Sequence, residues 1–87
     1  MLKEIKTYMY PAVYYKEGKY FNLSFVDLEE AYTFSDSMNG LIKEAQEVLS
    51  LTIEGRLEDN EDIPEPTKLS EVELKENQFK ILVEVTV

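Results

Sequence analysis

The apolar residues of this chain recur most regularly between residues 35 and 58, where their spacing has the period of an α-helix. Oxygen-bearing side chains at residues 35–37 can accept hydrogen bonds from free backbone N–H groups, so the N-cap is expected among these three. Gly55 is a weak point at which the last turn can fray or stop. One stripe of the helix, its predicted core face, holds Met38, Leu41, Ile42, Ala45, Val48, Leu49, Ile53 and Leu57.

Such a helix needs an apolar surface to lie on, because helices of this length gain most of their stability from packing. Residues 7–16 are rich in aromatic and β-favouring side chains and predict a strand. Pro11 has no N–H to donate, which favours an edge position or a bulge there. Residues 20–25 alternate apolar and polar side chains and predict a second strand, which pairs back across a turn at Gly18.

The remaining segments complete an α+β order. Residues 32–34 predict a short third strand, and residues 59–67 an extended acidic loop with two prolines. Ser70 and Glu73 have the spacing of a capping box, which favours one helical turn within residues 68–76. Residues 78–87 predict a last strand whose first half is apolar on both sides, as in a central strand. We therefore expect a single domain, residues 1–87, with a small antiparallel or mixed sheet covered by one long helix.

The charge and composition narrow the function. The net charge is −9, which disfavours direct nucleic-acid binding and suits a basic partner. There is no cysteine and no histidine, so thiol chemistry and the commonest general base are both excluded. No apolar run is long enough to span a membrane, and a cytoplasmic location is expected. Residues 54–76 hold nine acidic residues against three basic ones, and this stretch is either a surface for a basic partner or a solvated loop.

Several short motifs occur in the order and spacing found in one known family. Tyr10-Pro11-Ala12 lies on the first strand, and Gly18 and Tyr20 supply a glycine turn followed by an aromatic residue. Residues 25–30 read FVDLEE, where the family has F-P-D-L-P-G, and residues 33–37 read TFSDS, where it has T-x-G-D-T. Residues 63–67, IPEPT, are similar to its I-P-x-P-S loop. In these motifs, and in a helix carrying Ala45, Glu47 and Leu49, the chain resembles the HicB-like antitoxins over roughly residues 8–87.

The resemblance implies a partly degenerate ribonuclease-H-like fold and a non-catalytic antitoxin. Its expected partner is a small basic HicA-type toxin, an mRNA-cleaving enzyme whose RNA-binding and active site the antitoxin would mask. A C-terminal DNA-binding segment, carried by many members, is expected to be absent here. The alternative is an orphan homologue, a dimeric module with another protein or a small ligand as partner. Predicted toxin contacts are Tyr10, Pro11, Phe25, Asp27, Leu28, Thr33, Asp36, Glu58, Asp59, Glu61 and Asp62.

Two further possibilities concern metals and self-association. A ribonuclease-H-like fold raises the possibility of a metal site at Asp27, Asp36 and Glu44, but such chemistry needs carboxylates that converge. We predict instead a turn residue, a helix cap and a solvated side chain, with no bound metal or cofactor. Six tyrosines lie in the strand region, more than so small a core can hold. This favours a homodimer, or a higher homo-oligomer, that uses an edge strand.

Overall fold

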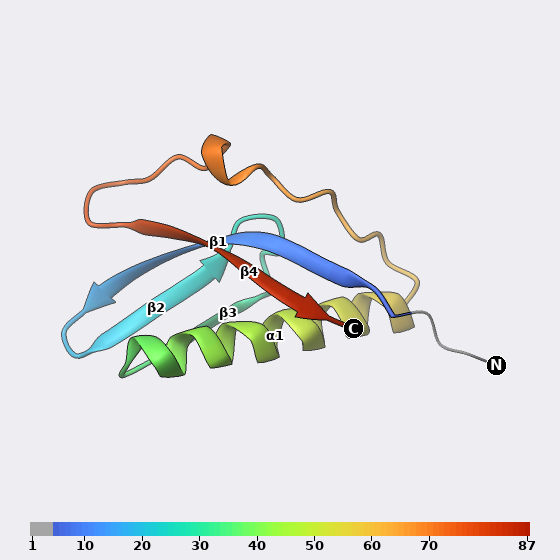
Figure 1. Ribbon diagram of the computed structural model, residues 1–87, viewed down its shortest axis with the longest axis horizontal. Coiled ribbons are helices and arrows are strands. Elements are labelled where there is room, and N and C mark those ends of the chain that lie inside the picture. The colour runs from blue at the N-terminus through green and yellow to red at the C-terminus, as the bar shows by residue number, and fades with distance from the viewer. Residues whose placement is uncertain (1–4) are drawn as a thin grey trace.

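Four antiparallel strands form one sheet, and a single long helix packs against one of its faces. The computed structural model describes residues 5–87. The strands pair in the order β3-β2-β1-β4, so β1 and β2 are interior and β3 and β4 are the edges. In Figure 1 the helix lies below the sheet, and segment 59–78 returns on the opposite side. The elements are β1 (Thr7–Glu17), β2 (Tyr20–Phe25), β3 (Tyr32–Ser35), α1 (Met38–Glu58), the 3₁₀ turn η1 (Leu69–Glu71) and β4 (Phe79–Thr86).

The core lies between α1 and the sheet. Alternation along β2 directs every second side chain toward the helix, as the sequence predicts. Full burial of each large apolar side chain contributes about 1.5–3 kcal/mol, so these contacts hold α1 in place. The buried side chains of this core are Tyr10, Ala12, Leu23, Phe25, Leu28, Ala31, Leu41, Ala45, Leu49, Ile53, Val83 and Val85.

The core face of α1 is narrower than the predicted stripe. Leu41, Ala45, Leu49 and Ile53, at four-residue steps, are fully buried. Met38 and Val48 pack at the margin and are half-buried. Ile42 and Leu57 were expected in the core, but they are 39% and 47% exposed. A single sheet contacts only one side of a helix, so apolar residues outside that line stay in solvent.

Both ends of α1 are capped, by a side chain at the N-terminus and by backbone hydrogen bonds at the C-terminus. Ser37 is the N-cap, and its hydroxyl accepts a hydrogen bond from the Gly40 N–H at 3.0 Å. Asp36 is exposed and is not the N-cap, contrary to prediction. At the other end the helix continues past Gly55, and Asn60 adopts a left-handed φ of 56°. The Asn60 N–H then donates to the Leu57 carbonyl, and the Glu61 N–H to the Arg56 carbonyl, which is a Schellman motif.

Pro11 lies in an interior strand, so the expectation of an edge position is wrong. Lys6 and Val87 exchange two backbone hydrogen bonds, of 3.0 and 2.9 Å, which directs the backbone groups of even-numbered β1 residues toward β4. The nitrogen of Pro11 therefore faces the β2 side. There it lies one position beyond the last pair of the β1–β2 ladder, Ala12 with Phe25. The Pro11 carbonyl accepts a hydrogen bond from the Val26 N–H at 3.1 Å, so the proline removes only the return bond of this terminal Pro11–Val26 pair, at the end of the β1–β2 ladder.

Two predictions for the C-terminal third also fail. The last strand, β4, is an edge strand, and Leu82 on its outer face is 44% exposed. Its apolar first half indicated a central strand, because sequence alone does not show which neighbours a strand has. The helical turn predicted within residues 68–76 is present as η1, but Ser70 lies inside it and forms no capping box, since the N-cap is Lys68 and makes no side-chain cap bond.

Candidate functional site

The last residue of α1 and the segment that follows it, residues 58–67, cross from the helix to the opposite side of the sheet and are here called the acidic strap (Figure 1). It has no regular secondary structure after the helix ends at Glu58. The Schellman motif at Asn60 sets the direction in which the chain leaves the helix. Three separate contacts then fix the strap to the body of the protein.

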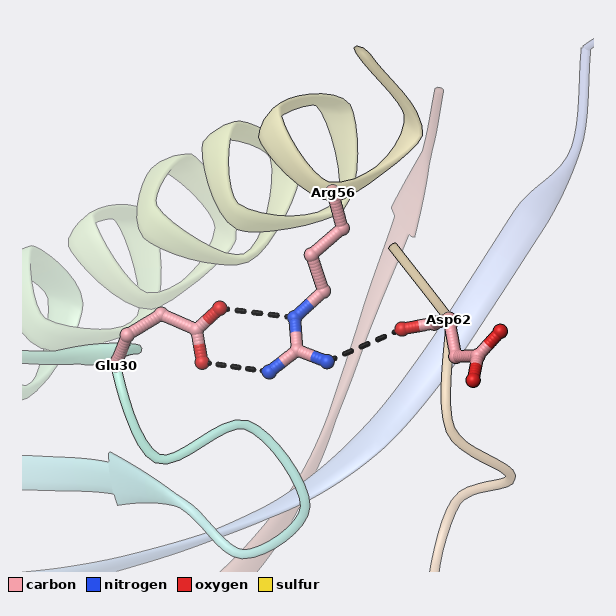
Figure 2. Close-up of polar contacts among 3 residues, drawn as sticks. All are labelled: Glu30, Arg56 and Asp62. Atoms are coloured by element: carbon pink, nitrogen blue, oxygen red, sulfur yellow. Dashed lines mark hydrogen bonds and ion pairs between the residues drawn. The ribbon is translucent and has the colours of Figure 1, made fainter. Parts of the chain in front are cut away.

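The first contact is made by Arg56, in the last turn of α1. Its Nε and Nη2 donate to the two carboxylate oxygens of Glu30, at 2.8 and 2.7 Å, while Nη1 donates to the backbone carbonyl of Asp62 at 3.1 Å. Figure 2 shows one guanidinium joining the helix, the β2–β3 loop and the strap. The carboxylate of Asp62 points away from Arg56 in the same view. Hydrogen bonds from Arg56 lower the pKa of Glu30, so this carboxylate stays ionised in mildly acidic solution.

The second contact joins Asp27, in the β2–β3 loop, to Thr67 at the end of the strap. The Thr67 N–H donates to one carboxylate oxygen of Asp27 at 2.9 Å, and the Thr67 hydroxyl to the other at 2.6 Å. The pair is partly buried. Both oxygens of Asp27 are therefore engaged in holding the strap, which is a structural role.

The third contact is made by Tyr10 of β1. Its hydroxyl donates a hydrogen bond to the backbone carbonyl of Pro64. The Tyr10 ring is buried, and burial is the main cause that raises the pKa of its hydroxyl, with the negative charges of Asp27 and Glu65 adding to the effect. The strap is thus fixed at residues 62, 64 and 67 by side chains from α1, β1 and the β2–β3 loop, respectively.

The carboxylates of the strap face solvent. Glu58, Asp59, Glu61, Asp62 and Glu65 are all exposed. Among residues 5–87 one ion pair is present, Arg56 with Glu30, so no carboxylate of the strap is part of an ion pair there. The strap therefore presents a row of negative charges on a backbone that is held in one conformation. Preorganisation of this kind lowers the entropy cost of binding a partner.

The predicted contact residues fall into three groups. Tyr10, Pro11, Phe25 and Leu28 are buried, and Asp27 is half-buried beneath the strap. Thr33 and Asp36 lie away from the strap, on β3 and in the turn before α1. The structure brings together four exposed acidic residues at one place: Glu58, Asp59, Glu61 and Asp62. That any of these residues contacts a toxin stays a prediction.

The sequence interpretation missed the residues that fix the strap. Glu30 and Thr67 are 26 and 40 positions from their partners Arg56 and Asp27, and no local pattern connects them. The available signal was Arg56 itself, because a single arginine inside an acidic stretch can donate hydrogen bonds to several carboxylate and carbonyl oxygens at once.

The three carboxylates considered for metal chemistry do not form a group. Asp27 is occupied by Thr67, Asp36 is exposed before α1, and Glu44 is exposed on the helix. Within residues 5–87 no set of three His, Cys, Asp or Glu side chains is arranged to hold a metal ion. In the same part of the chain, no helix combines the length and the apolar character needed to cross a membrane.

The fold defines an α+β protein with a four-stranded antiparallel sheet and one covering helix. A family described as the HicB-like antitoxins of bacterial toxin–antitoxin systems matches residues 9–85, and the chain belongs to this family. The resemblance found in the sequence is thereby confirmed. No curated protein matches the chain at a significant level.

Solved structures share this fold at low sequence identity. A toxin–antitoxin complex from Streptococcus pneumoniae aligns with a TM-score of 0.81 and 18% identity, covering 91% of this chain and 69% of that one. The N-terminal domain of Burkholderia pseudomallei antitoxin HicB aligns with a TM-score of 0.78 and 19% identity, over 90% and 98% of the two chains. A HicA3 and HicB3 toxin–antitoxin complex gives a TM-score of 0.71 and 22% identity, over 87% and 95%.

Proposed function

We propose that this chain is a non-catalytic antitoxin that binds a small basic HicA-type mRNA-cleaving toxin and masks its RNA-binding and active site. The family supports an antitoxin role, and two of the similar structures are toxin–antitoxin complexes. The fold would be the degenerate ribonuclease-H-like fold that the resemblance implies, acting in the cytoplasm. We include self-association in this proposal.

The observation that carries the proposal is the acidic strap. A surface that binds RNA must itself be basic, because it contacts phosphates. A rigid row of carboxylates is complementary to such a surface and competes with RNA for it. The solvated-loop alternative predicts a strap without fixed contacts, whereas this one is fixed at three points. An orphan homologue with another partner remains the second candidate, with the same strap as its charged surface.

The test is a binding and rescue experiment. The chain is expressed together with the protein encoded by the adjacent open reading frame, and scored by rescue of growth and by co-purification. In the strap variant Asp59→Asn, Glu61→Gln and Asp62→Asn are combined, and binding should weaken roughly tenfold or more, since charge pairs at interfaces contribute over a kcal/mol each when close. The matched control combines Glu17→Gln, Glu44→Gln and Glu47→Gln, three exposed acids elsewhere, and removes the same charge.

The outcomes separate the candidates. Rescue by the wild type and the control but not by the strap variant supports the proposal. Equal weakening by both variants would show that net charge alone acts, and would remove the role of the strap. No binding to a basic toxin by the wild type would leave the orphan homologue as the better interpretation.

A further inference from the structure

The two edges of the sheet differ in how they are protected. At the β4 edge the Gln46 side chain donates to the Glu84 carbonyl at 3.3 Å, and η1 lies against the strand. Lys80 and Glu84 also place charges along β4. These are devices that keep an edge from pairing with another chain. The β3 edge, Tyr32–Ser35, has no charged residue and no proline.

The backbone of β3 exposes a regular set of pairing groups. The Phe25 N–H donates to the Ala31 carbonyl at 3.0 Å, which shows that Ala31 directs its backbone groups toward β2. By the alternation of an antiparallel ladder, Thr33 and Ser35 do the same, and Tyr32 and Phe34 direct their N–H and C=O groups outward. The side chains of these two residues are also 70% and 63% exposed.

We propose that two copies of this chain pair through β3, antiparallel, about a two-fold axis at Thr33. This register places Tyr32 opposite Phe34 of the second copy, and Phe34 opposite its Tyr32. Each of the two Tyr32–Phe34 pairs then forms two backbone hydrogen bonds and one aromatic side-chain contact between the copies. The result is one continuous eight-stranded sheet with the protected β4 strands at its ends.

A second copy fits this edge better than a basic partner does. Each chain carries a net charge of −9, so two copies can approach closely only through an uncharged surface. β3 itself carries no charge, and the sheet face beside it presents aromatic rings: the Tyr20 and Phe34 ring centroids lie 5.8 Å apart in an edge-on arrangement, and Tyr15 is 39% exposed. A basic toxin would find no carboxylate on this strand. Pairing also closes the assembly, because β3 is the one edge without such protection in the sheet that residues 5–87 form.

The inference deepens the self-association within the proposed function by naming its surface, and it does not require toxin binding. Sedimentation over a wide concentration range measures the dimer, and hydrogen exchange reads the Tyr32 and Phe34 amides. In the dimer these two amides should be protected, and dilution should remove the protection. Phe34→Lys should raise the dissociation constant roughly tenfold or more, since it replaces an aromatic pair by like charges across the axis. Leu82→Lys on the β4 edge is the matched control and should leave the dimer intact.

Three results would overturn the proposal: a wild type that is monomeric throughout, a dimer whose Tyr32 and Phe34 amides exchange freely, or dissociation by Leu82→Lys and not by Phe34→Lys. Thermal unfolding of both variants confirms that they fold. Toxin binding by the Phe34→Lys variant is measured separately. If this variant is monomeric and still binds toxin, dimerisation through β3 and toxin binding by the acidic strap are independent of each other.

Discussion

Thr67 donates two hydrogen bonds to the carboxylate of Asp27, one from its N–H at 2.9 Å and one from its hydroxyl at 2.6 Å. The pair joins the end of the acidic strap to the β2–β3 loop, 40 positions earlier in the chain. Asp27 was a predicted toxin contact, and it was also one of the three carboxylates considered for a metal site. The structure gives this carboxylate a different task, because both of its oxygens already have donors from the protein.

The first prediction is that Asp27→Asn destabilises the fold by about 1–3 kcal/mol, because one of the two Thr67 donors then faces an amide N–H₂. The free energy of unfolding in urea measures the loss. Thr67→Val removes the hydroxyl donor and keeps the N–H, so a smaller loss of about 1 kcal/mol is expected. An Asp27→Asn protein as stable as the wild type would show that the bonds do not hold the strap.

The second prediction concerns pH. Arg56 lowers the pKa of Glu30 in the folded state, so folding is favoured while Glu30 is ionised. This contribution is fully present above the usual glutamate pKa of about 4.3 and is lost as the pH falls through the lower folded value. The difference in stability between wild type and Glu30→Gln should thus be largest at neutral pH and shrink in acid. Because Glu30 is 47% exposed, the whole difference will be small.

Urea unfolding at a series of pH values checks this prediction. Glu29→Gln is the matched control, since it removes a neighbouring exposed carboxylate that makes no hydrogen bond to Arg56 within residues 5–87. A difference between wild type and Glu30→Gln that does not change with pH would contradict the role assigned to the ion pair.

The third prediction compares two apolar residues of α1. Leu49 is fully buried, and Leu49→Ala should cost about 2–5 kcal/mol because it leaves a cavity in the core. Ile42, predicted in the same stripe, is 39% exposed, and Ile42→Ala should cost about 1 kcal/mol or less. Thermal or urea unfolding measures both, and equal losses would mean that the sheet covers more of the helix than the structure shows.

Periodicity in the sequence predicts those features of the fold that depend on residues close together in the chain. The helix, the first hairpin and the alternation of Leu23 and Phe25 follow from spacing alone, and the structure confirms them. The width of the core face could not be predicted in this way, because it depends on how many strands lie beneath the helix. Ile42 and Leu57 were misplaced for that reason.

Sheet order and the contacts of the strap depend on residues far apart in the chain. Pro11 indicated an edge and Leu82 a centre, and the true order reverses both. A proline in an interior strand costs little where the pairing with its neighbour is about to end, and where it ends depends on β2 rather than β1. The acidic residues of the strap were recognised from the sequence, but the side chains that hold it were not, because Arg56 and Glu30 share no local pattern.

The last prediction is that salt acts oppositely on the two proposed interfaces. Association between the acidic strap and a basic toxin is driven by attraction of opposite charges, so its rate constant should fall as ionic strength rises. The dimer joins two chains that each carry −9, so screening should strengthen it. Stopped-flow association and sedimentation equilibrium, each run across a salt series, measure the two trends. An association rate with toxin that does not depend on salt would remove electrostatics from the strap proposal, and a dimer that salt dissociates would point to charged contacts instead of the uncharged β3 edge.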